Sequence, residues 1–209
     1  MIPKALFFDL RAVFSVDLRG LALFRIALGI ILIADLLIRA PDLILWLSDD
    51  GLTPREWIIQ WNNDWRFSLY FVHGHWLWAA LLNCVAALSA MALMLGYRTR
   101  LSTLVSFVLL GSLHFRAPML LQGGDMLLVI MLFWSVFLPL GARYSIDATL
   151  VRSSAEGVDP NPGPARTSNT YLSVASAAIL LQAMAVYFFS AWLKTGAEWQ
   201  VDGTAIYYA

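Results

Sequence analysis

Two stretches of this chain, residues 76–97 and 167–193, contain no charged side chain. A membrane-spanning helix needs about 20 predominantly apolar residues to cross the ~30 Å hydrocarbon layer of a bilayer. Of the 209 residues, 60% are apolar and 13% are charged, about half the charged share of a soluble domain. The formal net charge is zero, so no basic surface indicates nucleic-acid binding. The chain is expected to be an integral membrane protein.

Five apolar runs are long enough, wholly or nearly, to span a bilayer. They are residues 20–38, 76–97, 101–115, 126–141 and 167–193. The fold class expected is therefore all-α, a polytopic transmembrane helical bundle of about five spans. Residues 1–209 are expected to form one domain, and the abrupt ending "GTAIYYA" leaves open whether they are part of a longer protein.

The distribution of Lys and Arg predicts the orientation. With the N-terminus inside, the cytoplasmic segments hold eight of these residues and the external segments hold five. Because cytoplasmic loops usually carry the excess, we expect a cytoplasmic N-terminus and an external C-terminus. Residues 142–170, rich in Pro, Gly, Ser and Asn, would then be a mobile cytoplasmic linker.

The loop 39–74 is expected to contain a helix. In "TPRE", Thr53 is suited to the N-cap, with a proline in the first turn and Glu56 closing a capping box. Trp57, Trp61 and Trp65 follow at spacings of four, so they would share one helical face. Tryptophan favours the headgroup level of a bilayer, which indicates a helix lying on the outer interface. A helix packed on the transmembrane bundle is the alternative.

Several polar residues interrupt the apolar runs. Arg25 and Asp35 lie in the first run, and each either reaches its own interface or faces the bundle interior. His114 ends the short third run, which lies between Arg100 and Arg116, two arginines whose long side chains could reach outward to complete the span. The "HGH" triplet lacks the spacing of a zinc pair, and the single cysteine cannot form an internal disulfide, so no metal site is predicted.

The segment "QGGDML" at 122–127 is the strongest local polar signal. Asp125 lies at or near the start of a helix, where a carboxylate can cap exposed N–H groups. Capping does not explain the two preceding glycines, which permit close approach by a ligand or another helix. Both interpretations stay open, a plain cap and a functional carboxylate.

Four stretches in order resemble a known family. They are "LALFRIALGIILIADL", "LMLGYRTRLSTLVSFVLL", "GGDMLLVIMLFWSVFLPLG" and "YFFSAWLKTGAEW". Together they resemble the HTTM domain, the transmembrane module of vitamin K-dependent gamma-carboxylases and of many bacterial relatives. The resemblance covers roughly residues 17–203, and it implies a membrane enzyme of the lyase or oxidoreductase type that acts on a reduced quinone with O2 and CO2.

The resemblance also implies roles for individual residues. Lys194, in "YFFSAWLKTGAEW", matches the lysine that deprotonates the hydroquinone, and Asp125 is the second catalytic candidate. The candidate substrate-binding residues are Arg25, His114, Arg116, Tyr187, Glu198 and Trp199. Gly124 occupies the position of the carboxylase histidine, so the chain resembles the bacterial type of member.

The sequence itself requires no cofactor, and the partners expected are a membrane lipid or quinone and an external peptide or small molecule. The alternative function is a non-catalytic quinone-binding, lipid-binding or scaffolding module of the DoxX-like kind, in which Lys194 only anchors a helix.

Overall fold

The computed structural model describes residues 13–62, 67–156, 169–200 and 203–204. The chain divides into two compact units. One unit comprises residues 16–171, and the other comprises residues 1–15 with 172–209. The described part of the chain is mostly helical.

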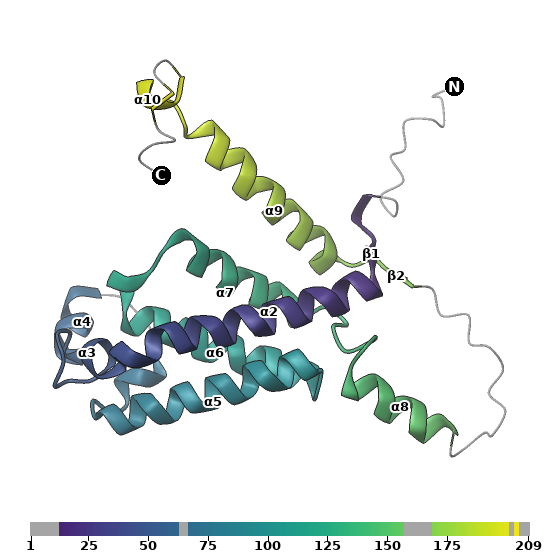
Figure 1. Ribbon diagram of the computed structural model, residues 1–209, viewed down its shortest axis with the longest axis horizontal. Coiled ribbons are helices and arrows are strands. Elements are labelled where there is room, and N and C mark those ends of the chain that lie inside the picture. The colour runs from purple at the N-terminus through teal and green to yellow at the C-terminus, as the bar shows by residue number, and fades with distance from the viewer. Residues whose placement is uncertain (1–12, 63–66, 157–168, 201–202, 205–209) are drawn as a thin grey trace. The chain divides into compact units, whose positions relative to one another are not determined.

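The larger unit is a bundle of four principal helices, α2 (Leu18–Arg39), α5 (Trp76–Leu95), α6 (Thr99–Arg116) and α7 (Gly123–Ser135). Helix α2 packs against α5, α5 against α6, and α6 against α7 (Figure 1). The remaining elements of this unit are η2 (Ala40–Asp42), α3 (Leu43–Leu47), α4 (Arg55–Asn62), η3 (Leu69–Phe71), η4 (Pro118–Leu120) and α8 (Ile146–Glu156).

The four helices alternate in direction, so the bundle has two ends. We call them the Arg39 end, where α2 and α6 finish and α5 and α7 begin, and the Arg25 end, where α2 and α6 begin and α5 and α7 finish. Small residues let α2 and α5 approach closely, because a Cβ atom on Gly29 would overlap Met94 and the carbonyl oxygen of Ala90. The hydroxyls of Ser89 and Ser106 join α5 to α6 at 3.0 Å.

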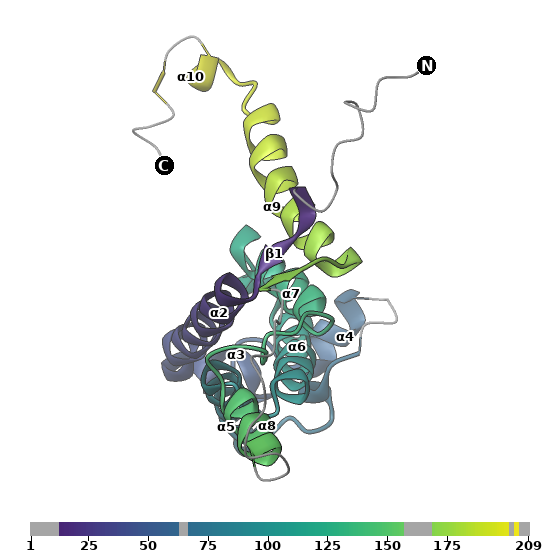
Figure 2. The ribbon, with the colours of Figure 1, turned by 90° about the vertical axis from the view of Figure 1, so that its right-hand side faces the viewer.

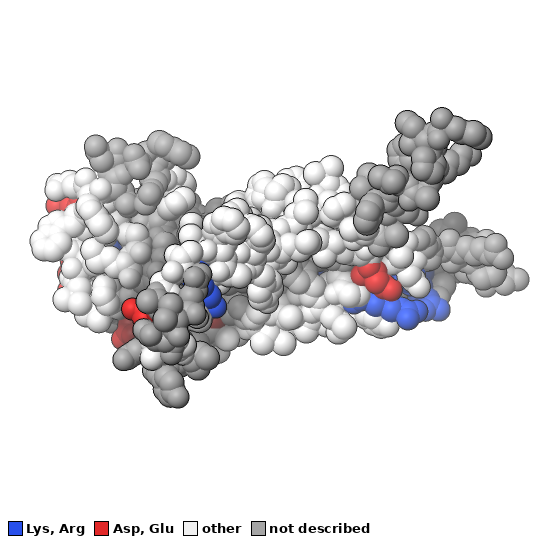
Figure 3. Space-filling model, turned by 90° about the horizontal axis from the view of Figure 1, so that it is seen from above, with Lys and Arg blue, Asp and Glu red and all other residues white. Residues whose placement is uncertain are grey.

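The described charges differ between the two ends. The Arg39 end has Asp35, Asp42, Asp49, Asp50, Glu56 and Asp125 against Arg39, Arg55 and Arg116, six acidic and three basic residues. The Arg25 end, besides the buried Arg25, has Asp17 and Asp147 against Arg19, Arg98, Arg100, Arg143 and Arg152, two acidic and five basic residues. In the view of Figure 3, most of the described side chains at the surface are uncharged, and few are Lys, Arg, Asp or Glu. An apolar middle between polar ends suits a protein that lies in a bilayer.

The five predicted runs all contain a helix, but the count of five spans is not confirmed. Three helical stretches are long and apolar enough to cross a membrane: residues 18–47, α5, and α9 (Val174–Trp192). Helix α7 has 13 residues, about 20 Å of helix, which is shorter than the ~30 Å hydrocarbon layer. Helix α6 carries two arginines, a histidine and several Ser and Thr residues, which lower its hydropathy.

The segment 142–170, expected to be a mobile linker, contains regular secondary structure in the part that the structure describes. Helix α8 occupies its middle, and β2 (Thr170–Tyr171) pairs antiparallel with β1 (Val16–Asp17), as Figure 2 shows. The first turn of α8 is fixed because Asp147 accepts hydrogen bonds from the backbone N–H groups of Arg98 and Thr99. Burial raises the pKa of Asp147, but these bonds and the Thr99 hydroxyl outweigh it, and the net pKa is lowered.

Helix α4 forms where "TPRE" predicts it, but with a different start. The Thr53 hydroxyl donates to the carbonyl of Trp46, and the carboxylate of Asp49 accepts from the N–H of Arg55 instead. Ile58 is buried, whereas Trp57 and Trp61 are 67% and 64% exposed. One face of α4 is thus packed and the tryptophan face is open, while Trp65 lies outside the described residues.

The smaller unit contains α9 and the short helix α10 (Ala197–Gln200). Ser173 and Ser176 form a reciprocal capping box at the start of α9, and the Ser176 hydroxyl also donates to the carbonyl of Phe14. The large apolar side chains of α9 that are exposed include Leu181, Met184 and Phe188. Such a surface suits a helix surrounded by lipid.

Candidate functional site

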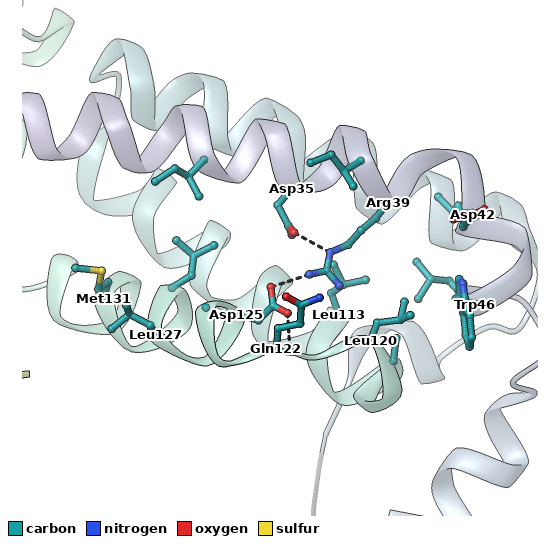
Figure 4. Close-up of a pocket in the computed structure, with 17 residues that line it drawn as sticks. Asp35, Arg39, Asp42, Trp46, Leu113, Leu120, Gln122, Asp125, Leu127 and Met131 are labelled. Atoms are coloured by element: carbon teal, nitrogen blue, oxygen red, sulfur yellow. Dashed lines mark hydrogen bonds and ion pairs between the residues drawn. The ribbon is translucent and has the colours of Figure 1, made fainter. Parts of the chain in front are cut away.

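The candidate site at the Arg39 end is a cluster of one guanidinium and two carboxylates (Figure 4). Nε of Arg39 lies 2.8 Å from Oδ1 of Asp35, and Nη2 of Arg39 lies 2.7 Å from Oδ1 of Asp125. All three side chains are mostly buried, with exposed fractions of 17%, 18% and 13%. Such hydrogen-bonded charge pairs are short and strong, so the cluster holds α2 and α7 in a fixed relation.

Local sequence positions each member of the cluster. Asp35 and Arg39 are four residues apart on α2, a spacing that places side chains on one face of a helix. Asp125 lies in the first turn of α7, and its Oδ2 accepts from the N–H of Gln122 at 2.8 Å. The two interpretations of "QGGDML" are therefore compatible, because one oxygen of Asp125 caps the helix and the other binds Arg39. The N-cap itself is Gln122.

A pocket of about 610 Å³ opens beside this cluster. Its lining includes Ile31 and Met131, which lie toward the middle of the bundle, and Asp42 and Trp46, which lie beyond the end of α2. Figure 4 shows Leu127 and Met131 on one side of the cluster and Trp46 on the other. The pocket thus runs from an apolar inner part to a polar outer part, with Arg39 between them.

Two polar atoms near the cluster have no hydrogen-bond partner among the described residues. One is Oδ2 of Asp35, which is buried although Asp35 lines the pocket. The other is Nε2 of His114, whose side chain is buried in α6. The three charges of the cluster interact electrostatically with the His114 side chain, but His114 does not line the pocket. Unpartnered buried polar atoms are uncommon and destabilising, so a bound ligand or water would satisfy them.

Glycine explains the width of the pocket on the side of α7. Gly124 lines the pocket, and a Cβ atom added there would meet nothing within 4 Å. The same is true of Gly123, which does not line the pocket. Among the described residues no other helix approaches these glycines closely, so of the two uses that the sequence left open, ligand access fits better.

Two of the predicted substrate-binding arginines are enclosed instead. Arg25 is fully buried at the opposite end, where its Nη2 donates to the carbonyl of Tyr144 at 2.6 Å. Of the two positions that the sequence left open for Arg25, the structure shows the one inside the bundle, where Gly96 lies against its guanidinium. Arg116 is also fully buried and donates to the carbonyl of Ser48 at 3.3 Å, so it does not reach outward. Neither arginine lines the pocket.

The remaining predicted residues lie in the smaller unit. The ammonium of Lys194 lies 4.1 Å from the centre of the Trp199 ring, a cation–π contact. Tyr187 and Lys194 are exposed, and Trp199 is 43% exposed. Nearby on α9, the rings of Phe188 and Trp192 stack at 5.8 Å. This segment is an aromatic surface with a cation at the end of α9, and its catalytic role stays a prediction.

Another cavity, of about 630 Å³, lies at the Arg25 end, so volume alone does not select the site. It is lined by Arg98, Thr99 and Asp147, among others. The polar groups of Asp147 and Thr99 already bind each other, as the cap of α6. The pocket at the Arg39 end differs because its lining includes Trp46 and also Asp35, a carboxylate with one buried oxygen that has no hydrogen-bond partner among the described residues. These are the groups that a ligand can bind.

Sequence reasoning missed Arg39, the centre of the cluster. It counted this residue only as an external loop charge, although Asp35 at the preceding helical turn was a signal for an ion pair. The pairing with Asp125 could not be found locally, since 86 positions separate the two residues. Family models, curated proteins and solved structures give no match to this chain.

Proposed function

We propose that this protein is an integral membrane protein that binds an amphiphilic ligand, of the lipid or quinone class, in the pocket beside Arg39. The observation that carries the proposal is the polarity of the lining, with Ile31 and Met131 at the inner part and Arg39, Asp42 and Asp125 at the outer part. Binding pockets for small molecules are mostly apolar with a few convergent polar groups.

The position of the pocket in the bundle supports an amphiphile over a water-soluble ligand. Ile31 lies inside the apolar stretch of α2, and Met131 lies inside the apolar helix α7. An alkyl or isoprenoid chain would replace lipid in this inner part, while a polar headgroup would lie at the level of Asp42 and Trp46, near the end of the bundle. This is the depth at which lipid headgroups and tryptophan side chains lie in a bilayer.

The adjacent glycines provide a matched test. Gly124→Phe should fill the pocket with little strain, because a side chain there starts in open space. Gly123→Phe should leave the pocket open, since Gly123 does not line it. Purified protein is released from detergent micelles in a mass spectrometer, and its retained small molecules are identified. We expect an amphiphile bound to the wild type and to Gly123→Phe, and its loss from Gly124→Phe. Equal retention in both variants would contradict the proposal.

The second candidate is the quinol-consuming, carboxylase-like enzyme that the HTTM resemblance implies, with Lys194 as the base. The observation that favours it is the contact of Lys194 with the ring of Trp199, together with the stacked rings of Phe188 and Trp192 on the preceding helix. If Lys194 is a base, Lys194→Ala and Lys194→Arg should both stop turnover of a quinol, because a guanidinium does not give up its proton near neutral pH. An active Lys194→Arg variant would contradict the role of Lys194 as a base, and only the proposed ligand binding would remain.

The orientation of the bundle is part of the same proposal. The five basic residues against two acidic ones favour a cytoplasmic Arg25 end, so the pocket would open near the external face. With Cys84→Ala as background, Ser153→Cys on α8 should resist impermeant thiol reagents in intact cells, and Asp50→Cys should react. The reverse labelling pattern would invert the orientation.

A further inference from the structure

We infer that the ligand of the pocket beside Arg39 carries a cationic headgroup, an organic ammonium. This inference rests on the proposed function, and it narrows the broad class of amphiphiles to one kind of headgroup. Four observations lead to it: the balance of charges in the lining, the unpartnered oxygen of Asp35, the occupied state of Arg39, and the tryptophan at the outer part of the pocket.

Carboxylates outnumber cations in the lining of the pocket. Asp35, Asp42 and Asp125 contribute three negative charges, and Arg39 contributes the single positive charge. Asp35 and Asp125 are mostly buried, at 18% and 13% exposed. Unbalanced charge in an environment of low polarity is destabilising, so a cation in the pocket would be bound more favourably than in water.

The oxygen Oδ2 of Asp35 gives this cation a specific place. Oδ1 of the same carboxylate binds Nε of Arg39, while Oδ2 is buried and has no partner among the described residues. An ionised carboxylate only accepts hydrogen bonds, so its partner must be a donor. An ammonium N–H group supplies the donor and the positive charge together, whereas a hydroxyl supplies only the donor.

The positive charge of Arg39 is already balanced by two carboxylates. Its Nε and Nη2 already bind Asp35 and Asp125, each at less than 3 Å. A fatty acid or a phosphate that bound the remaining N–H groups of Arg39 would lie next to the carboxylates of Asp35 and Asp125. Like-charge contacts of this kind oppose binding, so the cluster excludes anionic amphiphiles.

Trp46 adds an aromatic surface at the outer part of the pocket. It lines the pocket together with Asp42, and Figure 4 shows both on the side of the cluster away from Met131. Aromatic faces attract ammonium groups, and tryptophan does so best among the side chains. A chain along Ile31 and Met131 would therefore end in a headgroup between carboxylates and an indole ring.

The test is a competition between amphiphiles that share one chain and differ in headgroup. Full-length protein in dodecyl maltoside micelles, which are uncharged, is labelled with a dodecylamine analogue that carries a diazirine in its chain. Dodecylamine, dodecanol and dodecanoate then compete for labelling of α7. We expect dodecanol to compete about tenfold more weakly than dodecylamine, a difference of about 1.4 kcal/mol, and dodecanoate to compete more weakly still.

Variants link this preference to the lining. Asp35→Asn should remove most of the preference for dodecylamine over dodecanol, and Asp42→Asn, an exposed position at the rim, should reduce it in a protein that still folds. Asp49→Asn is the matched control, because Asp49 binds Arg55 and does not line the pocket. A preference unchanged in both Asp35→Asn and Asp42→Asn would overturn the inference.

The outcomes separate this inference from the function on which it rests. Saturable labelling of α7 with equal competition by dodecylamine and dodecanol, or with stronger competition by dodecanoate, would refute the ammonium and leave the amphiphile pocket standing. No saturable labelling of α7 would refute the pocket itself. A further arm adds phosphatidylethanolamine. Competition by it would assign the ammonium to a membrane lipid, and competition by dodecylamine alone would assign it to a single-chain amine. Either result supports the inference.

Discussion

Two of the arginines of helix α2, Arg25 and Arg39, have opposite surroundings. Arg25 is fully buried, and its Nη2 donates a hydrogen bond to a backbone carbonyl, that of Tyr144. Arg39 is 17% exposed and binds two carboxylates that line a pocket. Both residues are charged and lie on one apolar helix. Arg25 is enclosed by the chain at its end of the bundle, whereas Arg39 lies beside an accessible pocket at the other end.

The comparison indicates which surroundings suit a charged residue that stabilises the fold and which suit one that takes part in the proposed ligand binding. At the Arg25 end, α5 stops at Gly96, whose φ of +76° lets the chain turn over the guanidinium. At the Arg39 end, the two glycines before Asp125 have open space around them, and the pocket remains accessible. A charged side chain that is fully enclosed points to a role in the fold. A charged side chain whose ion-pair partners line a cavity points to a role in binding.

The largest expected effect on stability is that of Arg39→Leu. It leaves Asp35 and Asp125 facing each other without the cation between them, and such uncompensated carboxylates are destabilising by about 3 kcal/mol. Arg19→Leu is the control, because Arg19 is exposed on the same helix and should change stability by less than about 0.5 kcal/mol. Unfolding in detergent micelles measures both variants. Equal losses would mean that Arg39 is no more integrated than a surface arginine.

Gly96→Ala tests the Arg25 end of the bundle. Alanine at a φ of +76° is strained, and its Cβ would overlap Nη1 of Arg25, so we expect a loss of about 2 kcal/mol in the free energy of unfolding. Gly20→Ala is the matched control, since nothing lies within 4 Å of a Cβ there. Ligand retention by the folded fraction should not change. Loss of ligand in Gly96→Ala at full stability would assign binding to the wrong end.

Asp147→Asn should have a smaller effect that depends on pH. The lowered pKa of Asp147 means that its carboxylate stabilises the fold above the ordinary value of 3.8, and that this contribution disappears as the pH falls through the lowered value. At pH 7 we expect Asn to cost about 1 kcal/mol, as for the loss of a helix cap. The difference between variant and wild type should shrink in acid. Asp50→Asn, at an exposed position, is the control at pH 7, where it should change stability by less than about 0.5 kcal/mol.

The smallest effect is expected for Lys194→Ala. The side chain is exposed and contacts Trp199, so its removal should change the free energy of unfolding by less than about 0.5 kcal/mol. Thermal unfolding of this variant beside Tyr187→Ala, at an exposed position of α9, gives the comparison. A loss above about 1.5 kcal/mol would show that Lys194 supports the structure of its unit.

Much of the fold could be predicted from the sequence because helices in apolar runs are local events. The runs 76–97 and 167–193 contain α5 and α9, and "QGGDML" correctly marked the start of α7. Helix α8 escaped notice because its N-terminal turn is held by Asp147 against the start of α6, far away in the sequence. The pairing of Val16 with Tyr171 is likewise a contact between distant segments.

Only part of the site could be predicted, because its residues come from segments that are distant in the sequence. Asp125 and Asp35 could be singled out as polar residues in apolar surroundings, and the structure places both on Arg39. Their common partner depends on how α2 and α7 pack, which no local pattern reveals. Arg25 and Arg116 were also singled out as polar residues in apolar surroundings. In the structure both are buried, and each donates a hydrogen bond to a backbone carbonyl.

The most direct test of the central claim is to map where an amphiphile binds along the chain. Photolabelling with the diazirine analogue, followed by digestion and mass spectrometry, reports the labelled peptides. If the Arg39 end is the binding end, the label should fall on residues 123–131 of α7 and on the second half of α2, and it should decrease in Gly124→Phe but not in Gly123→Phe. Label concentrated on residues 98–101 and 138–151, around the cavity at the Arg25 end, would contradict this account.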